Sequence, residues 1–365
     1  MNDKEWMLQA MHEAARGGWG VHPNPMVGAI LVRNGEEIGR GYHHGAGLPH
    51  AEIEAIRDAA SRGYTDLTGA TIYVSLEPCN HFGRTPPCTE ALIRAGIARC
   101  VIGTVDFDER VRGAGIRRLQ EAGIECVVGF CEQELLELNA AFFSRTRDGR
   151  PFVTAKWAMT LDGHTATASG SSQWITGERA REDVHRERER HDAIMAGTQT
   201  VIADNPQLNV RLEGEHRQPL RMILDRSGRI PLDARVFDTS HQKTVVFTAS
   251  GTDPERWHGL DVAVERVAES SNGLDLREVL SCLARKYTIT TLYCEGGATL
   301  HGAMFDGGFI DQVHVYVAPK ITGGAAARGC IGGRGVDTMA QAVGLHFDEI
   351  RQLGDDVRLG GRIRR

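Results

Sequence analysis

Apolar and polar positions along the first 145 residues follow two different periods. Apolar residues at helical spacing predict helices, while short apolar runs predict strands. The helices are expected at 6–15, 50–62, 89–95, 113–122 and 132–143, and the strands at 27–32, 71–75, 100–105 and 124–128. Asn34-Gly35, soon after the first strand, is a two-residue hairpin signal. Strands that alternate with crossover helices are typical of an α/β domain with a central sheet.

The second half repeats this alternation. Strands are predicted at 152–158, 192–196, 220–224, 244–247, 289–294 and 313–318, and helices at 178–189, 275–286 and 298–304. The segment from Arg145 to Pro151 is polar and carries Gly and Pro, a composition that is typical of a linker. We therefore expect domains at 1–145 and 151–365, joined by a linker at 146–150. The tail 360–365 has no role that its sequence indicates.

Composition narrows the class of protein. A chain of 365 residues with 41% hydrophobic and 25% charged residues is expected to fold as two ordinary domains. With a net charge of −6, the chain lacks the excess of basic residues that binding to nucleic acid or to an anionic membrane requires. Small molecules are therefore the favoured partners. Without a long apolar run or a signal peptide, the chain is expected to be cytoplasmic. The eight cysteines are too sparse for a disulfide framework, so they are interpreted as core residues or metal ligands.

One set of residues carries the signature of a metal site. His50-Ala51-Glu52 opens a predicted helix, and Cys79 and Cys88 follow about one strand later. One imidazole and two thiolates bind zinc and leave the fourth tetrahedral position for water, as in catalytic zinc sites. Glu52 then remains for proton transfer, as in zinc deaminases, although eight residues and not two separate the cysteines. The alternatives are a structural zinc clip and three unconnected core residues, and a structural clip does not explain Glu52.

A second pattern lies near residue 296. The run 288–297 is typical of a buried strand and ends in Gly296-Gly297, after which a helix is predicted. Such a turn can present backbone N–H groups to a pyrophosphate. The second half has no Gly-x-Gly-x-x-Gly fingerprint. Two glycines between a strand and a helix more often form only a tight turn.

These motifs together resemble the bacterial bifunctional riboflavin-biosynthesis deaminase/reductases. The deaminase half is recognised by His22-Pro23-Asn24-Pro25, His50-Ala51-Glu52 and the run 71–88, whose long inter-cysteine loop is the family's own form. The reductase half is recognised by Lys156, Leu161-Asp162-Gly163, the run 172–176, Ala203-Asp204-Asn205-Pro206 and Glu295-Gly296-Gly297. The matching motifs span about residues 5 to 320.

The resemblance implies a fold and a reaction sequence. It implies an N-terminal cytidine-deaminase-like α/β/α domain and a C-terminal dihydrofolate-reductase-like α/β domain, with one zinc ion per chain and NADPH. Zinc-dependent hydrolysis would remove the 2-amino group of 2,5-diamino-6-(5-phosphoribosylamino)pyrimidin-4-one. NADPH would then reduce the ribosyl group and give 5-amino-6-(5-phosphoribitylamino)uracil. We expect a homo-oligomer, a dimer or a tetramer, between which the sequence does not select.

The resemblance also assigns roles residue by residue. His50, Cys79 and Cys88 would hold zinc and Glu52 would be catalytic, while Asn24, His43, His81 and Arg84 would hold the deaminase substrate, with His43 and Arg84 as phosphate donors. The cofactor contacts would be Ala158, Trp174, Thr200, Asp204, Arg226, Gly297, Ala298, Thr299, Leu300, His301, Gly302 and Ala303. The reductase substrate contacts would be Lys156, Ser172, Arg188, Leu208, Arg211 and Glu295, of which Arg188 and Arg211 suit a phosphate.

Two other functions fit parts of the sequence. A tRNA-editing type of zinc deaminase with an unrelated second domain would share the His50, Cys79 and Cys88 pattern, but it would need a basic, aromatic-rich surface. A zinc-stapled interaction module would need neither Glu52 nor a second ligand site.

Overall fold

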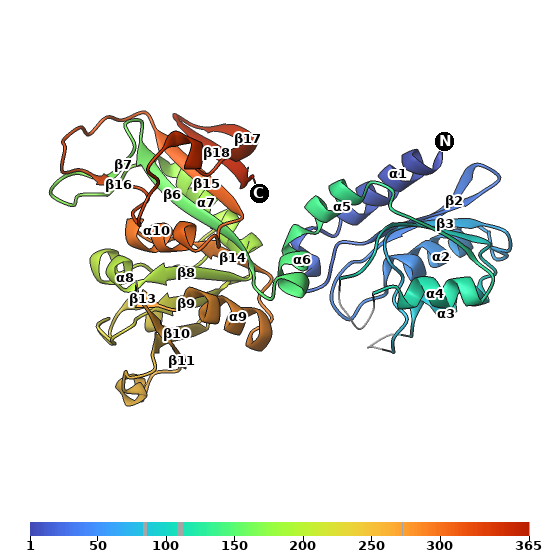
Figure 1. Ribbon diagram of the computed structural model, residues 1–365, viewed down its shortest axis with the longest axis horizontal. Coiled ribbons are helices and arrows are strands. Elements are labelled where there is room, and N and C mark those ends of the chain that lie inside the picture. The colour runs from blue at the N-terminus through green and yellow to red at the C-terminus, as the bar shows by residue number, and fades with distance from the viewer. Residues whose placement is uncertain (83–85, 108–111, 272, 365) are drawn as a thin grey trace. The chain divides into compact units, whose positions relative to one another are not determined.

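The computed structural model describes residues 1–82, 86–107, 112–271 and 273–364. The chain divides into two compact units, Met1–Gly149 and Arg150–Arg365, which are described separately (Figure 1). Within the described ranges, no helix is both long enough and apolar enough to traverse a bilayer.

The first unit is a three-layer α/β/α domain. Its elements are α1 Asp3–Ala15, the 3-10 helix η1 Gly18–Val21, β1 Gly28–Arg33, β2 Glu36–Tyr42, α2 Ala51–Ser61, β3 Thr71–Leu76, α3 Cys88–Arg94, β4 Arg99–Thr104, α4 Ala114–Glu121, β5 Glu125–Val128, α5 Glu132–Leu138 and α6 Ala140–Arg147. The strand order is β2-β1-β3-β4-β5, in which β3, β4 and β5 are parallel and β1 is antiparallel to β2 and β3.

Alternating residues of this sheet serve two cores. Ala29 and Leu31 of β1 pack with α2, α3 and α4 on one face, while Ile30 and Val32 pack with α1 and α5 on the other. Figure 1 shows these two groups of helices on opposite faces of the sheet. Helix α2 lies close to β2 because Gly41 has no side chain there: a Cβ atom would come within 2.4 Å of the backbone nitrogen of Ala55. Bulkier residues at position 41 would therefore move the helix that begins beside the metal-binding residues.

The second unit is built on one large sheet. Its strands are β6 Phe152–Thr160, β7 His164–Ala166, β8 Ala193–Gly197, β9 Leu220–Leu224, β10 Thr244–Ala249, β11 Ala263–Val267, β12 Glu269–Ser270, β13 Gly273–Leu274, β14 Thr291–Cys294, β15 Gln312–Ala318, β16 Arg328–Gly329, β17 Leu345–Leu353 and β18 Asp356–Ile363. Its helices are α7 Glu178–Arg190, α8 Thr198–Asp204, α9 Leu276–Lys286 and α10 Ala298–Asp306, with 3-10 turns η2 Arg235–Phe237, η3 Pro254–Trp257 and η4 Met339–Gln341.

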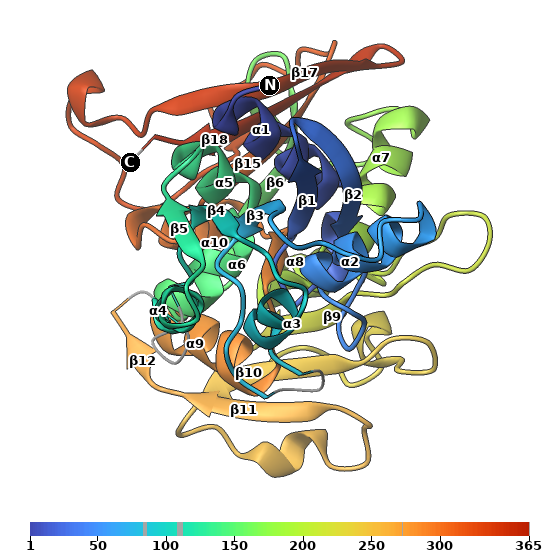
Figure 2. The ribbon, with the colours of Figure 1, turned by 90° about the vertical axis from the view of Figure 1, so that its right-hand side faces the viewer.

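Nine of these strands form the sheet in the order β11-β10-β9-β8-β14-β6-β15-β18-β17. Neighbouring strands from β11 to β15 are parallel, whereas β18 is antiparallel to both of its neighbours, β15 and β17. Figure 2 shows β11 and β17 at opposite edges. Apolar side chains of α9 and α10 cover one face, and α7 packs on Tyr293 and Tyr316 of the other. This is the arrangement of a dihydrofolate-reductase-like α/β domain.

The structure differs from the sequence prediction in three local respects. The helix expected at 132–143 is broken at Asn139, whose side chain bonds the backbone of Met26. The expected linker at 146–150 is helical as far as Arg147, where α6 ends. The tail belongs to the sheet as far as Ile363, because β17 and β18 form a hairpin around Gly354 that continues the sheet beyond β15.

Candidate active sites

Three side chains in the first unit converge on one point. His50 precedes α2, Cys79 follows β3 and Cys88 begins α3. The Nδ1 atom of His50 lies 3.5 Å from Sγ of Cys79 and 3.2 Å from Sγ of Cys88. In a tetrahedral zinc site with ordinary Zn–N and Zn–S bonds, such atoms lie about 3.5 Å apart. Among the described residues, this is the group of histidine, cysteine and acidic side chains close enough to hold a metal, and it fits zinc.

Glu52 lies beside this cluster but is not one of the three residues that supply its ligand atoms. It occupies the first turn of α2, two residues after His50, and only 3% of it is exposed. Burial, followed by the neighbouring Cys79 sulfur, raises the pKa of the Glu52 carboxyl to about 7. A buried carboxyl group next to a three-ligand metal cluster has the surroundings of a proton shuttle.

Asn24 and His43 are hydrogen-bonded to each other next to the cluster. The amide nitrogen of Asn24 lies 2.9 Å from Nε2 of His43, and Nδ1 of His43 lies 3.1 Å from the carbonyl oxygen of Pro49. Burial lowers the pKa of His43, so its ring is neutral, with Nδ1 as the donor to Pro49 and Nε2 as the acceptor from Asn24. In this arrangement the two ring nitrogens of His43 contact Asn24 and Pro49, so His43 orients the Asn24 amide. The expected role of His43 in holding the substrate phosphate stays a prediction.

The two other expected substrate residues lie in the loop between the cysteines. His81 is exposed at the start of this loop. Arg84 falls outside the described residues.

Two supporting residues were not anticipated from the sequence. Glu77, between β3 and Cys79, is buried and accepts backbone hydrogen bonds of 2.9 Å from both Gly113 and Gly115. These bonds tie the cysteine-bearing loop to the start of α4. Asn139 accepts from the N–H of Met26 at 2.8 Å and donates to its C=O at 2.9 Å, which holds the segment that carries Asn24. Both are polar residues at the end of an element, and sequence alone does not distinguish them from ordinary caps.

A cleft of about 1740 Å³ opens in the second unit. Seventeen of the eighteen residues expected to contact cofactor or substrate lie on its wall: Lys156, Ala158, Ser172, Trp174, Arg188, Thr200, Asp204, Leu208, Arg211, Arg226, Glu295, Gly297, Ala298, Thr299, Leu300, His301 and Ala303. Gly297 precedes α10 and no side chain caps that helix, so the N–H groups of its first turn face the cleft without an intrahelical acceptor.

Gly302 is the exception. A Cβ atom on this residue would lie 2.3 Å from the backbone of Gly332 and Gly333. Gly302 therefore serves the close packing of α10 against this loop and is not part of the cleft wall.

A buried charge cluster lies at the floor of the cleft. Arg188 of α7 donates to both carboxylate oxygens of Glu295, at 2.6 and 3.0 Å, and the Nζ atom of Lys156 lies 3.5 Å from the same carboxylate. Burial alone would raise the pKa of Glu295, but Arg188 and then Lys156 outweigh it and hold that pKa at about 2. Burial lowers the pKa of Lys156, an effect that Glu295 opposes. The cluster keeps Glu295 ionised and holds an amine beside it.

The arginines expected to bind phosphate differ in their freedom. Arg188 spends three of its five N–H groups on Glu295 and on the carbonyl oxygen of Asn209, at 2.9 Å for the latter. Arg211 is exposed and is held at 2.7 Å by the side chain of Asn209. Arg211 is therefore the more available phosphate ligand, and Asn209 positions both arginines.

The fold and the two sites define a class: a zinc-dependent deaminase domain followed by an α/β domain with a large ligand cleft. Residues 1–104 match the cytidine and deoxycytidylate deaminase zinc-binding region. Residues 151–359 match the RibD C-terminal domain, which excludes an unrelated second domain. The chain belongs to the RibD family of bifunctional deaminase/reductases of riboflavin biosynthesis. The family, both fold types and the two activities expected from the sequence are thereby confirmed.

Relatives cover the whole chain. The riboflavin biosynthesis protein RibD of Aquifex aeolicus is 39% identical over 97% of each chain, and that of Escherichia coli is 40% identical over 98% of this chain and 99% of its own. Among solved structures, RibD of Acinetobacter baumannii has a TM-score of 0.85 at 38% identity, covering 100% of this chain and 99% of its own. A diaminohydroxyphosphoribosylaminopyrimidine deaminase/5-amino-6-(5-phosphoribosylamino)uracil reductase of Thermotoga maritima has a TM-score of 0.80 at 34% identity, covering 99% of each.

Proposed function

We propose that the first unit hydrolyses the 2-amino group of 2,5-diamino-6-(5-phosphoribosylamino)pyrimidin-4-one and that the second unit reduces the ribosyl group of the product with NADPH. The observation that carries this proposal is the placement of buried Glu52 beside the ligand atoms of His50, Cys79 and Cys88. The names of the Thermotoga maritima relative's two activities support the choice of substrate.

In the deamination step, Glu52 moves the protons. A zinc ion on His50, Cys79 and Cys88 would activate water for attack on the carbon that bears the amino group. Glu52 would accept one proton from that water and deliver it to the departing amino group, which leaves as ammonia. The second water proton would pass to the adjacent ring nitrogen as the carbon gains its carbonyl oxygen. Asn24, whose amide is oriented by His43, holds an edge of the pyrimidine ring.

In the reduction step, the chain positions two ligands. NADPH would supply a hydride to C1′ of the ribosyl group. This requires the bond between C1′ and the ring oxygen to break and that oxygen to take up a proton. We assign the proton to the Lys156 ammonium group, which Glu295 holds in place at 3.5 Å. The first turn of α10 takes the pyrophosphate, and Arg211 takes the substrate phosphate.

The test is a two-stage incubation of the zinc-loaded chain with the diaminopyrimidinone phosphate. Without NADPH, mass spectrometry should show exchange of an amino group for oxygen together with release of ammonia. With NADPH, the product should gain two hydrogens. Lys156→Met should stop the second mass change and leave the first. If the chain leaves this substrate unchanged but deaminates another pyrimidine, the proposed substrate is wrong.

A further inference from the structure

A second charge cluster lies behind the cleft floor, between α7 and the sheet. It contains Asp183 and Glu187 of α7 and Arg358 of β18, which are 2%, 3% and 4% exposed. Buried charges cost free energy unless they are paired, and apolar residues of similar size often stabilise a fold more. Apolar residues could therefore attach the helix to the sheet at a lower cost in free energy, which suggests that the cluster has a role beyond stability.

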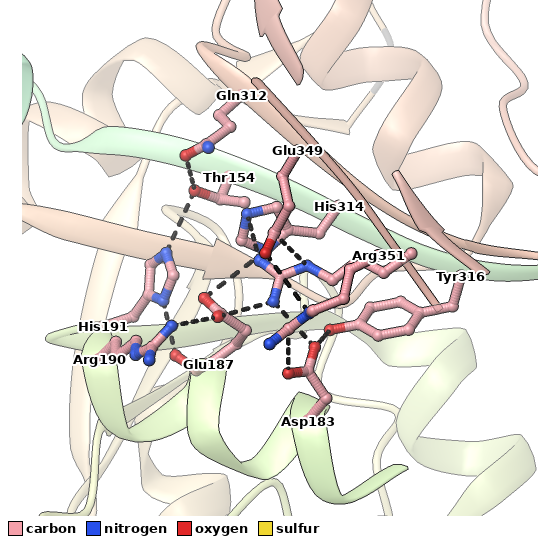
Figure 3. Close-up of polar contacts among 11 residues, drawn as sticks. Thr154, Asp183, Glu187, Arg190, His191, Gln312, His314, Tyr316, Glu349 and Arg351 are labelled. Carbon is pink, nitrogen blue, oxygen red and sulfur yellow. Dashed lines mark hydrogen bonds and ion pairs between the residues drawn. The ribbon is translucent and has the colours of Figure 1, made fainter. Parts of the chain in front are cut away.

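Arg358 is the bridge in this cluster. One of its terminal nitrogens donates to Oδ2 of Asp183 at 2.8 Å and to Oε1 of Glu187 at 2.9 Å. The other lies 3.0 and 3.2 Å from the ring nitrogens of His314 on β15. Tyr316 donates to the same Asp183 oxygen at 2.8 Å. Figure 3 shows Asp183 and Glu187 pointing from α7 toward the His314 and Tyr316 side chains of the sheet.

Further groups complete the surroundings of these two acids. Arg351 pairs with Asp183, and Arg190 donates to Glu187 at 2.8 Å (Figure 3). Both arginines are more exposed than Arg358. Burial, and then the charge of Arg358, lowers the pKa of His314 well below its usual range, so His314 is a neutral acceptor. Arg358 is thus the charge that reaches both acids from inside the sheet.

The cluster is continuous with the cleft floor. Glu187 and Arg188 are consecutive residues of α7: Glu187 is held by Arg358, while Arg188 forms the bidentate pair with Glu295. On the sheet, His314 lies directly opposite Lys156 in the register of β15 and β6. The position of α7 therefore decides how Arg188 meets Glu295.

We propose that Arg358 is a positioning residue of the reductase, whose bridge between Asp183 and Glu187 holds α7 where Arg188 pairs with Glu295. Without the bridge, α7 would shift, because two buried carboxylates would lose their common partner. The two hydrogen bonds between Arg188 and Glu295 have little tolerance for such a shift. This inference rests on the proposed reductase function.

The experiment is a double-mutant cycle in the full chain. Arg358→Met should raise the Michaelis constant for the deaminated substrate about 10- to 100-fold, because Arg188 and Glu295 are expected substrate contacts and a misplaced charged contact weakens binding by roughly this factor. The Michaelis constant for NADPH and the rate of deamination should stay within about 2-fold. In an Arg188→Met background, Arg358→Met should add little further loss, since both changes disturb the same pair.

Two further variants separate geometry from fold stability. Arg362→Met is the matched control, because Arg362 lies on the same strand but pairs with Asp348 of the β17 hairpin arm at a half-exposed position. It should leave the reductase kinetics unchanged. Arg358→Lys keeps the charge, but it lacks the planar guanidinium group that lets Arg358 contact two acids and an imidazole at once. It should regain most of the melting temperature and keep the raised Michaelis constant.

Each contrary outcome has one meaning. If Arg358→Met lowers only the melting temperature, or if its kinetic effect adds fully to that of Arg188→Met, Arg358 does not act through Arg188. If Arg358→Lys restores the kinetics as well, charge alone suffices and the bridge is not the cause. If the unmodified chain does not reduce the deaminated substrate with NADPH, the proposed function fails and this inference fails with it, an outcome that is visible before any variant is compared.

Discussion

The side chain of Asn139 holds both the N–H and the C=O of Met26, at 2.8 and 2.9 Å. The two residues are 113 positions apart, yet this pair fixes the segment on which Asn24 faces the zinc-binding cluster. A residue between two helices thereby controls a loop of the deaminase site.

Asn139→Ala should therefore impair deamination without affecting zinc. Removing both bonds leaves two backbone groups of Met26 to find new partners, which costs about 1–3 kcal/mol each where they remain buried. We expect a raised Michaelis constant for the diaminopyrimidinone, measured by ammonia release, with unchanged zinc content. Gln133→Ala, on the exposed side of α5, is the matched control and should be neutral. Unaltered kinetics in both variants would show that the Met26 segment holds its shape unaided.

Glu52→Gln should keep zinc and lose deamination. The amide has the shape of the carboxylate but cannot carry a proton, and general acid–base groups typically supply about 10²–10⁴-fold in rate. Cys88→Ser should instead lose the metal, because it removes one of three ligands. Zinc analysis and ammonia release distinguish the two variants. A Glu52→Gln protein that purifies without zinc, or deaminates normally, contradicts the shuttle role.

Arg226→Ala should weaken the binding of NADPH but not that of NADH. Arg226 lies on the cleft wall after β9, in a turn whose backbone is held by the Asp225 carboxylate at 2.9 Å from the N–H of Arg229. Charge-assisted bonds to a 2′-phosphate contribute roughly 1.5–3 kcal/mol, so the Michaelis constant for NADPH should rise about 10- to 100-fold and that for NADH should not.

Glu269 provides the matching variant for this test. Its carboxylate lies 3.5 Å from Nε of Arg226 and competes with a phosphate, so Glu269→Gln should lower the Michaelis constant for NADPH. Equal effects of Arg226→Ala on both cofactors would move the 2′-phosphate contact to Ser227 or Arg229, which also line the cleft.

A fragment that starts at Gly149 should reduce the deaminated intermediate without the first unit. Arg150 must be retained, because its guanidinium bonds both oxygens of Asp311 at 2.7 and 2.8 Å, and Asp311 in turn accepts from the N–H of Val153. A fragment that starts at Phe152 is the matched comparison and should melt at a lower temperature. A folded Gly149 fragment without reductase activity would mean that the site needs residues from elsewhere.

Most helices and strands could be predicted because their apolar residues repeat with the period of the element. The hairpin at Asn34 and Gly35 also follows from sequence, since both residues take the left-handed backbone conformation that such a turn requires. The zinc-binding residues are recognisable because their types and spacing follow from coordination chemistry.

What could not be predicted depends on contacts between distant residues. The break at Asn139 coincides with the bonds of its side chain to Met26, and the partners of the His43 ring are Pro49 and Asn24. The local sequence pattern indicates neither set of contacts. Strand β18 cannot be predicted from its sequence, because two glycines interrupt its apolar pattern and an arginine such as Arg358 is usually exposed. A buried position for a charged residue can be predicted only when its ion-pair partners are known.

The place of β18 in the sheet also bears on the order in which the chain can fold during synthesis. The first unit has all its strands once residue 128 has been made, whereas β15 and β17 are joined through a strand that ends at Ile363. At 5–20 residues per second, ribosomes need on the order of 10–50 s to cover that interval. The zinc-binding unit is therefore expected to be folded, and able to load its metal, while the reductase sheet is still incomplete on the ribosome. Protease resistance of nascent chains stalled near residue 300 would test this order.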